Sequence, residues 1–269
     1  MVVKEPAMPA PPYEYPDRPS FIGLYASEQG IRAIDSPVKV RILDMLARQE
    51  MAFEDLVDGS GRAKSTVSVH LKDLAESGIV GAKSDPSDGR KKIFYLNALY
   101  LAAADSSGRG WFDPDSYIPG TFNGEGDPGT MARFILSTIR LTLLSQGIMI
   151  DPVLRLAGIK AGKAMYPRVK APGIEELIRN IARIWKENNL GTLELECLDP
   201  VTINICDCFE CIDLPVMGKP ACAFDSGILS SLFSSFYGNR MIAIETHCYA
   251  MGSNLCRFVV MEQDEPEIS

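Results

Sequence analysis

Three cysteines and a glutamate near the end of the chain have the residue types and spacing of a metal site. Glu245, Cys248 and Cys256 lie within one short segment, and Cys222 stands upstream at the start of a predicted helix. Structural zinc sites take four ligands, with thiolates favoured and carboxylates permitted. These four residues are therefore predicted to hold Zn²⁺. In the alternatives, His247 is the fourth ligand, or the cysteines are small buried hydrophobic residues.

The terminal segment must bend for its three donors to meet. Strand alternation alone would place Glu245 and Cys248 on opposite faces. The strand is therefore expected to end or bulge near Thr246. The sequence Gly252-Ser253-Asn254 is expected to turn the chain so that Cys256 returns beside Cys248.

The remaining thiols suggest redox chemistry. The chain has seven cysteines, all in its last third, and an odd number disfavours a pure disulfide framework. Thiols as close as those of the CDCFEC segment can pair when oxidised or bind a soft metal. A redox switch is predicted there, with a second metal contact and inert packing as alternatives. Its candidate residues are Cys206, Cys208 and Cys211, with Cys197 upstream.

An α+β domain with mostly antiparallel strands is expected to position these side chains. The hydrophobic periodicity predicts three helices, then two strands, one helix and two final strands. In chain order the ranges are Met131–Gln146, Asp151–Met165, Ile174–Asn188, Thr192–Leu198, Val201–Asp207, Cys222–Tyr237, Arg240–Thr246 and Leu255–Met261.

A separate helical pattern precedes this domain. Phe21–Ile34 is predicted to be a short amphipathic helix, serving as a dimer helix or as core. A second helix starts at Ser36-Pro37, where serine suits the N-cap and proline the first turn. A third covers Ala52–Asp58, a fourth carries the apolar stripe of Val67, Leu71 and Leu74, and a hairpin follows at Ile79–Lys83 and Arg90–Leu96.

Helix, helix, turn, helix and hairpin is the order of a winged helix-turn-helix domain. Short polar side chains on the last helix are expected to read base edges in the major groove, while cations on the wing contact phosphates. The alternative is a winged helix used only for protein contacts. The predicted DNA-binding residues are Arg62, Lys64, Ser65, Thr66, Ser68, His70, Lys72, Arg90, Lys91 and Lys92.

Two resemblances agree with these predictions. The pattern from Ser65 to Val80 resembles the recognition helix of ArsR-type regulators, although Phe53–Val57 has no cysteine where the metal-sensing members have theirs. The spacing of the four predicted zinc ligands resembles the zinc site of the 4-vinyl reductase domain, a likeness that extends over Met131–Met261. Phenol-sensing bacterial activators use that domain as a sensor. The combination resembles the methanogen redox regulators called MsvR, which implies an archaeal homodimeric repressor.

Composition sets the predicted organisation. The 269 residues carry a formal net charge of −8, so any DNA binding needs a local basic patch. No signal pattern or long apolar run is present, which predicts a cytoplasmic protein. The predicted segments are a Pro-rich arm at 1–20, the DNA-binding domain at 21–104, a Gly- and Pro-rich linker at 105–130, the zinc-containing sensor domain at 131–263 and an acidic tail at 264–269.

The predicted function is a transcription regulator, with DNA binding controlled by the thiol redox state of the zinc-containing domain. The first alternative is a sensor of a small apolar or aromatic ligand, because Leu, Ile and Met residues between Met131 and Met165 could wall a pocket. A thiol or reductase enzyme is the other alternative. We expect no enzyme, because the chain has no dinucleotide fingerprint and only two histidines.

Overall fold

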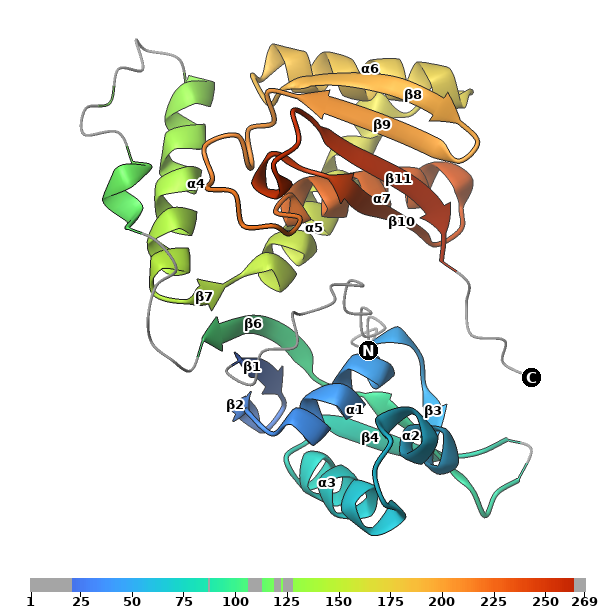
Figure 1. Cartoon of the computed structure of the whole chain (residues 1–269). Helices are drawn as coiled ribbons and strands as arrows, with labels where there is room; N and C mark the ends of the chain where they lie inside the picture. Colours follow the sequence, from blue (N-terminus) through green and yellow to red (C-terminus); the bar gives the residue numbers. More distant parts are fainter. Residues whose placement is uncertain (1–20, 87, 106–112, 119–121, 123–127, 264–269) are drawn as a thin grey trace. The chain divides into compact units, whose positions relative to one another are not determined.

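The computed structural model describes residues 21–86, 88–105, 113–118, 122 and 128–263 (Figure 1). The chain divides into two compact units. The first contains residues up to 108 together with 148–152, and the second contains 109–147 and 153–267. The predicted arm, the acidic tail and most of the predicted linker lie outside the described residues.

The first unit contains the predicted winged helix. Helices α1 (Pro37–Arg48), α2 (Phe53–Ser60) and α3 (Lys64–Glu76) precede strands β4 (Val80–Ser84) and β5 (Lys92–Leu96), and the short β3 (Met51–Ala52) completes a sheet of order β3-β5-β4. Ile42, Leu56, Val67 and Ile79 are fully buried between the helices and this sheet. The predicted helices and hairpin are confirmed, and α3 ends before Gly78, whose φ is +69°.

The helix predicted at Phe21–Ile34 is wrong. The segment forms β1 (Phe21–Ser27) and β2 (Gly30–Ile34), joined by a turn in which Gly30 has a φ of +104°. β1 also pairs with β6 (Leu99–Asp105), which pairs in turn with β7 (Ile148–Met149). Tyr25 is buried, with its ring centroid 5.0 Å from that of Tyr100 on β6. The strand therefore depends on a partner far away in sequence, which local periodicity does not reveal.

Asp44 on α1 carries a charge that the first unit disfavours. Burial raises the pKa of its carboxyl to about 6, although Arg48 and Arg41 oppose this shift. Because the folded state holds the proton more tightly than the unfolded chain, this group destabilises the fold increasingly as pH rises from about 4 to about 6.

Asp44→Asn is expected to stabilise the first unit at pH 7.5 by about 1 kcal/mol, after discounting a two-unit shift for partial solvent contact. At pH 4 the gain should nearly vanish, because wild-type Asp44 is then protonated in the folded state. Urea unfolding at the two pH values measures both effects. An equal gain at both pH values would show that the charge of Asp44 is not responsible.

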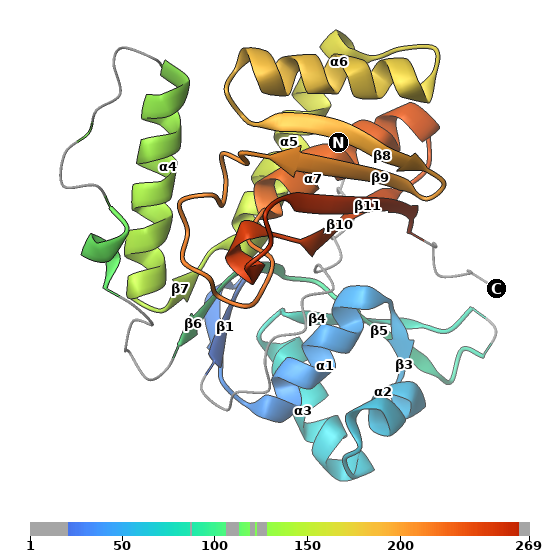
Figure 2. The same cartoon turned by 45° about the horizontal axis from the view of Figure 1, so that its top comes forward.

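The second unit is an α+β domain around an antiparallel sheet of order β10-β11-β9-β8. α7 packs against β10, and α6 lies along β8 (Figure 2). None of the helices in the described ranges is long and apolar enough to cross a membrane. The elements confirm the predicted order, and their bounds are η1 (Pro114–Ser116), α4 (Pro128–Ser145), α5 (Asp151–Val169), α6 (Ile174–Glu187), β8 (Thr192–Leu198), β9 (Val201–Cys206), α7 (Ala223–Tyr237), β10 (Met241–His247), η2 (Tyr249–Met251) and β11 (Cys256–Glu262).

Glycines let α5 and α7 approach closely. A Cβ at Gly158 of α5 would overlap the carbonyl oxygen of Phe224, and a Cβ at Gly227 of α7 would overlap that of Arg155. Arg155 also donates to the hydroxyl of Ser226 at 2.5 Å. Most of α7 from Ala223 to Phe233 is buried. These contacts fix the start of α7, which carries Cys222 at its N-cap.

Candidate functional site

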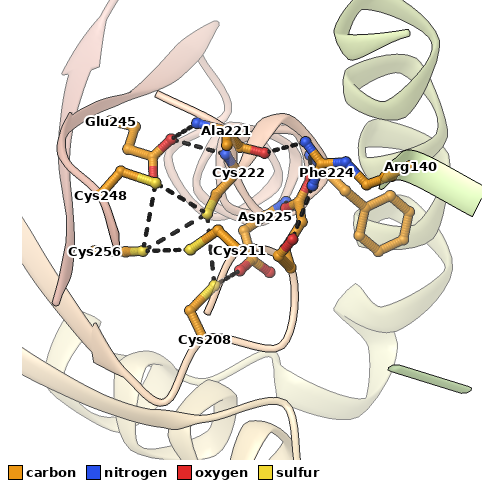
Figure 3. Close-up of polar contacts among 11 residues, drawn as sticks. Arg140, Cys208, Cys211, Ala221, Cys222, Phe224, Asp225, Glu245, Cys248 and Cys256 are labelled. Carbon is orange, nitrogen blue, oxygen red and sulfur yellow. Dashed lines mark hydrogen bonds and ion pairs between the residues drawn. The ribbon is translucent and has the colours of Figure 1, made fainter. Parts of the chain in front are cut away.

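Five of the seven cysteine side chains converge in the second unit (Figure 3). All five are buried, and they come from three parts of the domain. Two lie in the segment after β9, one caps α7, and two flank the turn between β10 and β11. We call this set the cysteine cluster, and its members are Cys208, Cys211, Cys222, Cys248 and Cys256.

The sulfur spacings suit metal coordination. Cys222 Sγ lies 3.5 Å from Cys208 Sγ, 3.6 Å from Cys256 Sγ and 3.8 Å from Cys248 Sγ. Cys256 Sγ lies 3.2 Å from Cys211 Sγ and 4.0 Å from Cys248 Sγ. Zn–S bonds of about 2.3 Å in a tetrahedron place sulfurs about 3.8 Å apart, whereas a disulfide requires about 2.05 Å. The cluster therefore has free thiols at the spacing of a tetrahedral thiolate site.

Glu245 completes the donor set that the sequence predicts. Its Oε2 accepts hydrogen bonds from the backbone N–H groups of Ala221 at 3.1 Å and Cys222 at 2.9 Å. Its Oε1 is buried and has no hydrogen-bond partner among the described residues. Burial raises the pKa of this carboxyl well above its ordinary value. A bound cation would supply the missing partner and favour the ionised form, so the residues fit a metal ion.

The strand bends as expected. The register of β10 against β11 shifts between Glu245 and His247, and Gly252 turns the chain with a φ of +87°. Glu245, Cys248 and Cys256 thereby meet Cys222, and their donor atoms lie within 4.8 Å of one another. His247, the alternative ligand, is exposed, and its Nδ1 lies 3.1 Å from Thr246 Oγ1.

The four predicted switch cysteines separate into two pairs. Cys208 and Cys211 belong to the cysteine cluster, where they form a second possible donor set with Cys222 and Cys256. Hydrogen bonding with the neighbouring thiols, chiefly that of Cys211, lowers the pKa of Cys208. Cys206 is half-buried and Cys197 is exposed. The CDCFEC segment therefore does not form a site separate from the predicted zinc ligands.

Three charged residues beside the cluster escaped the sequence prediction. Arg140 of α4 donates to the Glu210 side chain at 3.3 Å and to the Ala221 carbonyl at 2.7 Å. Glu210 in turn accepts from the backbone N–H groups of Phe224 and Asp225, both at 2.9 Å. Burial raises the pKa of Glu210 to about 8, opposed by Arg140. This buried network fastens the segment of Cys208 and Cys211 to the start of α7.

Asp225 is the third of these residues. Its Oδ2 lies 3.4 Å from Cys208 Sγ, while Oδ1 is buried without a hydrogen-bond partner among the described residues. Burial raises its pKa well above the ordinary value. The available sequence signal was its position three residues after Cys222 at a helix start, on the same helix face.

The first unit presents the predicted nucleic-acid interface. Ser65, Ser68 and Lys72 are exposed on α3, as expected from the buried stripe on its other face. Val69 shares the exposed face and is 66% exposed. Sequence reasoning missed it, although it is an apolar residue outside the Val67, Leu71 and Leu74 stripe. An exposed apolar side chain on such a helix can contact the methyl group of thymine.

A cavity of about 600 Å³ lies between α3 and the wing of β4 and β5. Its charged lining is mostly basic, with Glu54 as the acidic member, and Arg90 also pairs with Asp88 at 3.1 Å. Arg62, Lys64 and Ser65 are exposed at the other end of α3, and Thr66 and His70 are half-buried. The cations in the lining are Lys72, Arg90, Lys91 and Lys92.

Comparisons with known families agree with this division. A model of the ArsR family of bacterial regulatory proteins matches residues 36–81, and a model of the 4-vinyl reductase domain matches residues 201–262. The chain therefore combines an ArsR-type helix-turn-helix region with an α+β domain of the 4-vinyl reductase type. The ArsR-type match indicates a DNA-binding transcription regulator, and the buried cysteine cluster could hold a metal ion.

Curated relatives come from Methanocaldococcus jannaschii. Uncharacterized protein MJ1642 is 35% identical over 82 residues, which are 30% of this chain and 51% of that protein. MJ0745 is 31% identical over 30% of this chain and 44% of its own length. MJ0150 is 24% identical over 49% of this chain and 76% of its own length. The chain thus spans about half the length of the first two relatives.

Solved structures also resemble the chain. One is a vinyl-4-reductase family protein from Methanocaldococcus jannaschii, with 21% identity and a TM-score of 0.37 over 53% of this chain and 85% of that chain. Another is the phenol-responsive sensory domain of the transcription activator PoxR with phenol, with 12% identity and a TM-score of 0.33 over 74% of this chain and 90% of that chain.

Proposed function

We propose that the protein is a homodimeric, cytoplasmic transcription repressor whose DNA binding is controlled by the thiol redox state of its 4-vinyl reductase-like domain. The observation that carries this proposal is the union, in one chain, of an exposed recognition helix with a cluster of five buried, mutually contacting thiols. The regulator resembles the MsvR type in this combination.

DNA binding follows from the exposed face of α3 and the cationic wing. Ser65, Ser68 and Val69 would meet base edges in the major groove, because they share the face opposite the buried stripe. Lys64, Arg90 and Lys91 would contact phosphates. A symmetric dimer would then occupy two half-sites about one helical turn apart.

The sensing step is oxidation within or beside the cysteine cluster. Two thiols would lose two electrons and two protons to a peroxide, which becomes two water molecules, and an S–S bond would form. Cys211 and Cys256, with sulfurs 3.2 Å apart, and Cys208 and Cys222, 3.5 Å apart, are the closest pairs. Exposed Cys197 and half-buried Cys206 would meet an oxidant first.

A disulfide formed by ligand cysteines can no longer supply thiolates to a metal. Oxidation would therefore release the ion and loosen the start of α7, since Cys222 caps this helix. Two packings of the domain, one reduced and one oxidised, would then differ in the dimer geometry that they impose on DNA.

Gel-shift titration tests redox control directly. The DNA would be a fragment selected from a random pool by the reduced protein. Oxidation with hydrogen peroxide is expected to weaken binding at least tenfold, and added reductant should restore it. The Cys208→Ser/Cys211→Ser double variant should bind this DNA but respond less. Equal affinity of oxidised and reduced wild-type protein would reject redox control.

The proposed dimer has an apolar surface available in the second unit. Met131, Ile135 and Ile139 recur at one face of α4 and are 43%, 49% and 50% exposed. The segment predicted as a dimer helix, Phe21–Ile34, is a β-hairpin and offers no such stripe. Light scattering of the reduced protein should give twice the chain mass of 29.5 kDa, and a single chain mass would oppose the dimer.

The same stripe favours one alternative, a sensor of a small apolar or aromatic ligand. Exposed apolar side chains on α4 can form one wall of a binding site, which a ligand would complete. Phenol and related compounds would then raise the melting temperature of the protein without any change of thiol state. No melting shift, together with a redox-dependent gel shift, would favour the redox proposal.

A further inference from the structure

The cysteine cluster offers more donors than one ion can use. Two sets of four donors each lie within 4.8 Å of one another, and they share two cysteines. A tetrahedral Zn²⁺ takes four ligands, so one ion leaves two donors unused. The first set is Cys208, Cys211, Cys222 and Cys256, and the second is Cys222, Glu245, Cys248 and Cys256.

We propose that the cluster holds two divalent metal ions, bridged by the thiolates of Cys222 and Cys256. This inference rests on the metal site of the proposed function and adds a second ion to it. One ion has Cys248 and Glu245 as its terminal ligands. The other has Cys208 and Cys211.

The sulfur positions match the bridged arrangement. The bridging pair is 3.6 Å apart, and metal–sulfur bonds of about 2.3 Å to both sulfurs place the two ions roughly 3 Å apart. Each terminal cysteine lies near a bridging one. Cys208 is 3.5 Å from Cys222, Cys211 is 3.2 Å from Cys256, and Cys248 is 3.8 Å from Cys222. Six donors thus supply two tetrahedra that share one edge.

Charge favours two ions over one. Five thiolates and one carboxylate carry six negative charges, of which one divalent ion neutralises two and a pair neutralises four. The backbone N–H groups of Ala221 and Cys222 donate to Glu245 at one side. The N-terminal end of α7, where Cys222 is the N-cap, adds its partial positive charge. Buried anions need such compensation, and a second cation provides most of it.

Carboxylate oxygens without a hydrogen-bond partner among the described residues flank both halves of the cluster. Glu245 Oε1 is the one on the side of Cys248. Asp225 Oδ1 is the one on the side of Cys208, whose sulfur lies 3.4 Å from Asp225 Oδ2 (Figure 3). A single ion at the Glu245 side explains only the first of these oxygens. An ion on each side explains both, since each places positive charge near one carboxylate.

Metal counting on the full-length protein tests the proposal. Elemental analysis of reduced wild-type protein, loaded with zinc and freed of excess, is expected to give two zinc ions per chain. Cys208→Ser/Cys211→Ser should retain one ion and so should Glu245→Gln/Cys248→Ser. The matched control Cys197→Ser/Cys206→Ser changes the two cysteines outside the cluster and should retain two.

Cobalt titration of the metal-free wild type avoids reliance on variants that fail to fold. Thiolate-to-cobalt absorption should rise to two equivalents, and magnetic coupling between bridged ions should weaken the paramagnetic signal as the second binds. One ion per wild-type chain, or acid-labile sulfide in place of a second ion, would overturn the pair. One ion would leave the proposed function intact, whereas no ion at all would also remove its metal site.

Discussion

Cys222→Ser is expected to leave the purified protein without bound zinc and to lower the stability of the second unit by several kcal/mol, on the order of 5. Cys222 lies in both donor sets, and its sulfur is within 3.8 Å of the sulfurs of Cys208, Cys248 and Cys256. Serine retains the backbone N–H that donates to Glu245. The loss would therefore report the thiolate and not the helix start.

Elemental analysis and thermal unfolding followed by circular dichroism measure the two effects. The matched control is Cys197→Ser, because Cys197 is exposed and donates at 3.4 Å only to the Asp199 carbonyl. A strong chelator added to reduced wild-type protein should reproduce the loss of stability without any mutation. A metal content equal to wild type in Cys222→Ser would refute the site.

The triple variant Lys64→Ala/Arg90→Ala/Lys91→Ala is expected to bind DNA about 100-fold more weakly than wild type at physiological salt. All three side chains are exposed, one at the start of α3 and two beside the wing strand β5. Each lost phosphate contact removes about 0.9 from the slope of log K against log salt concentration, so the magnitude of the slope should fall by about 2.7.

Fluorescence anisotropy at several salt concentrations measures affinity and slope together. The control variant Lys160→Ala/Arg168→Ala/Lys170→Ala removes the same charges from exposed positions at α5 in the second unit. It separates local contacts from the effect of net charge, which is −8 in wild type. Full affinity in the first variant, or an equal loss in both, would reject the wing and α3 as the DNA-binding surface.

Sequence patterns were most reliable where the signal is local. The stripe of Val67, Leu71 and Leu74 predicted α3 and its exposed face, because every residue involved lies within a few helical turns. The bend near Thr246 also followed from a local conflict. Two donors on opposite faces of one strand cannot reach one ion unless the register shifts, and the shift is present.

The predictions weakened where partners are distant along the chain. Phe21–Ser27 pairs with Leu99–Asp105, and that pairing decides strand over helix. Arg140 reaches Glu210 and Ala221 from α4, so its burial follows only from the packing of α4. No local period encodes such contacts, since they form when elements that are individually marginal pack together.

The sequence by itself determined the two chemistries of this protein, a recognition helix with a cationic wing and a zinc-like quartet of Cys222, Glu245, Cys248 and Cys256. Residue type and short spacing suffice for both. Only the tertiary structure decided that Cys208 and Cys211 join the quartet. The segment after β9 folds back onto the start of α7 because Glu210 binds the N–H groups of Phe224 and Asp225, and this long-range contact turns four donors into six.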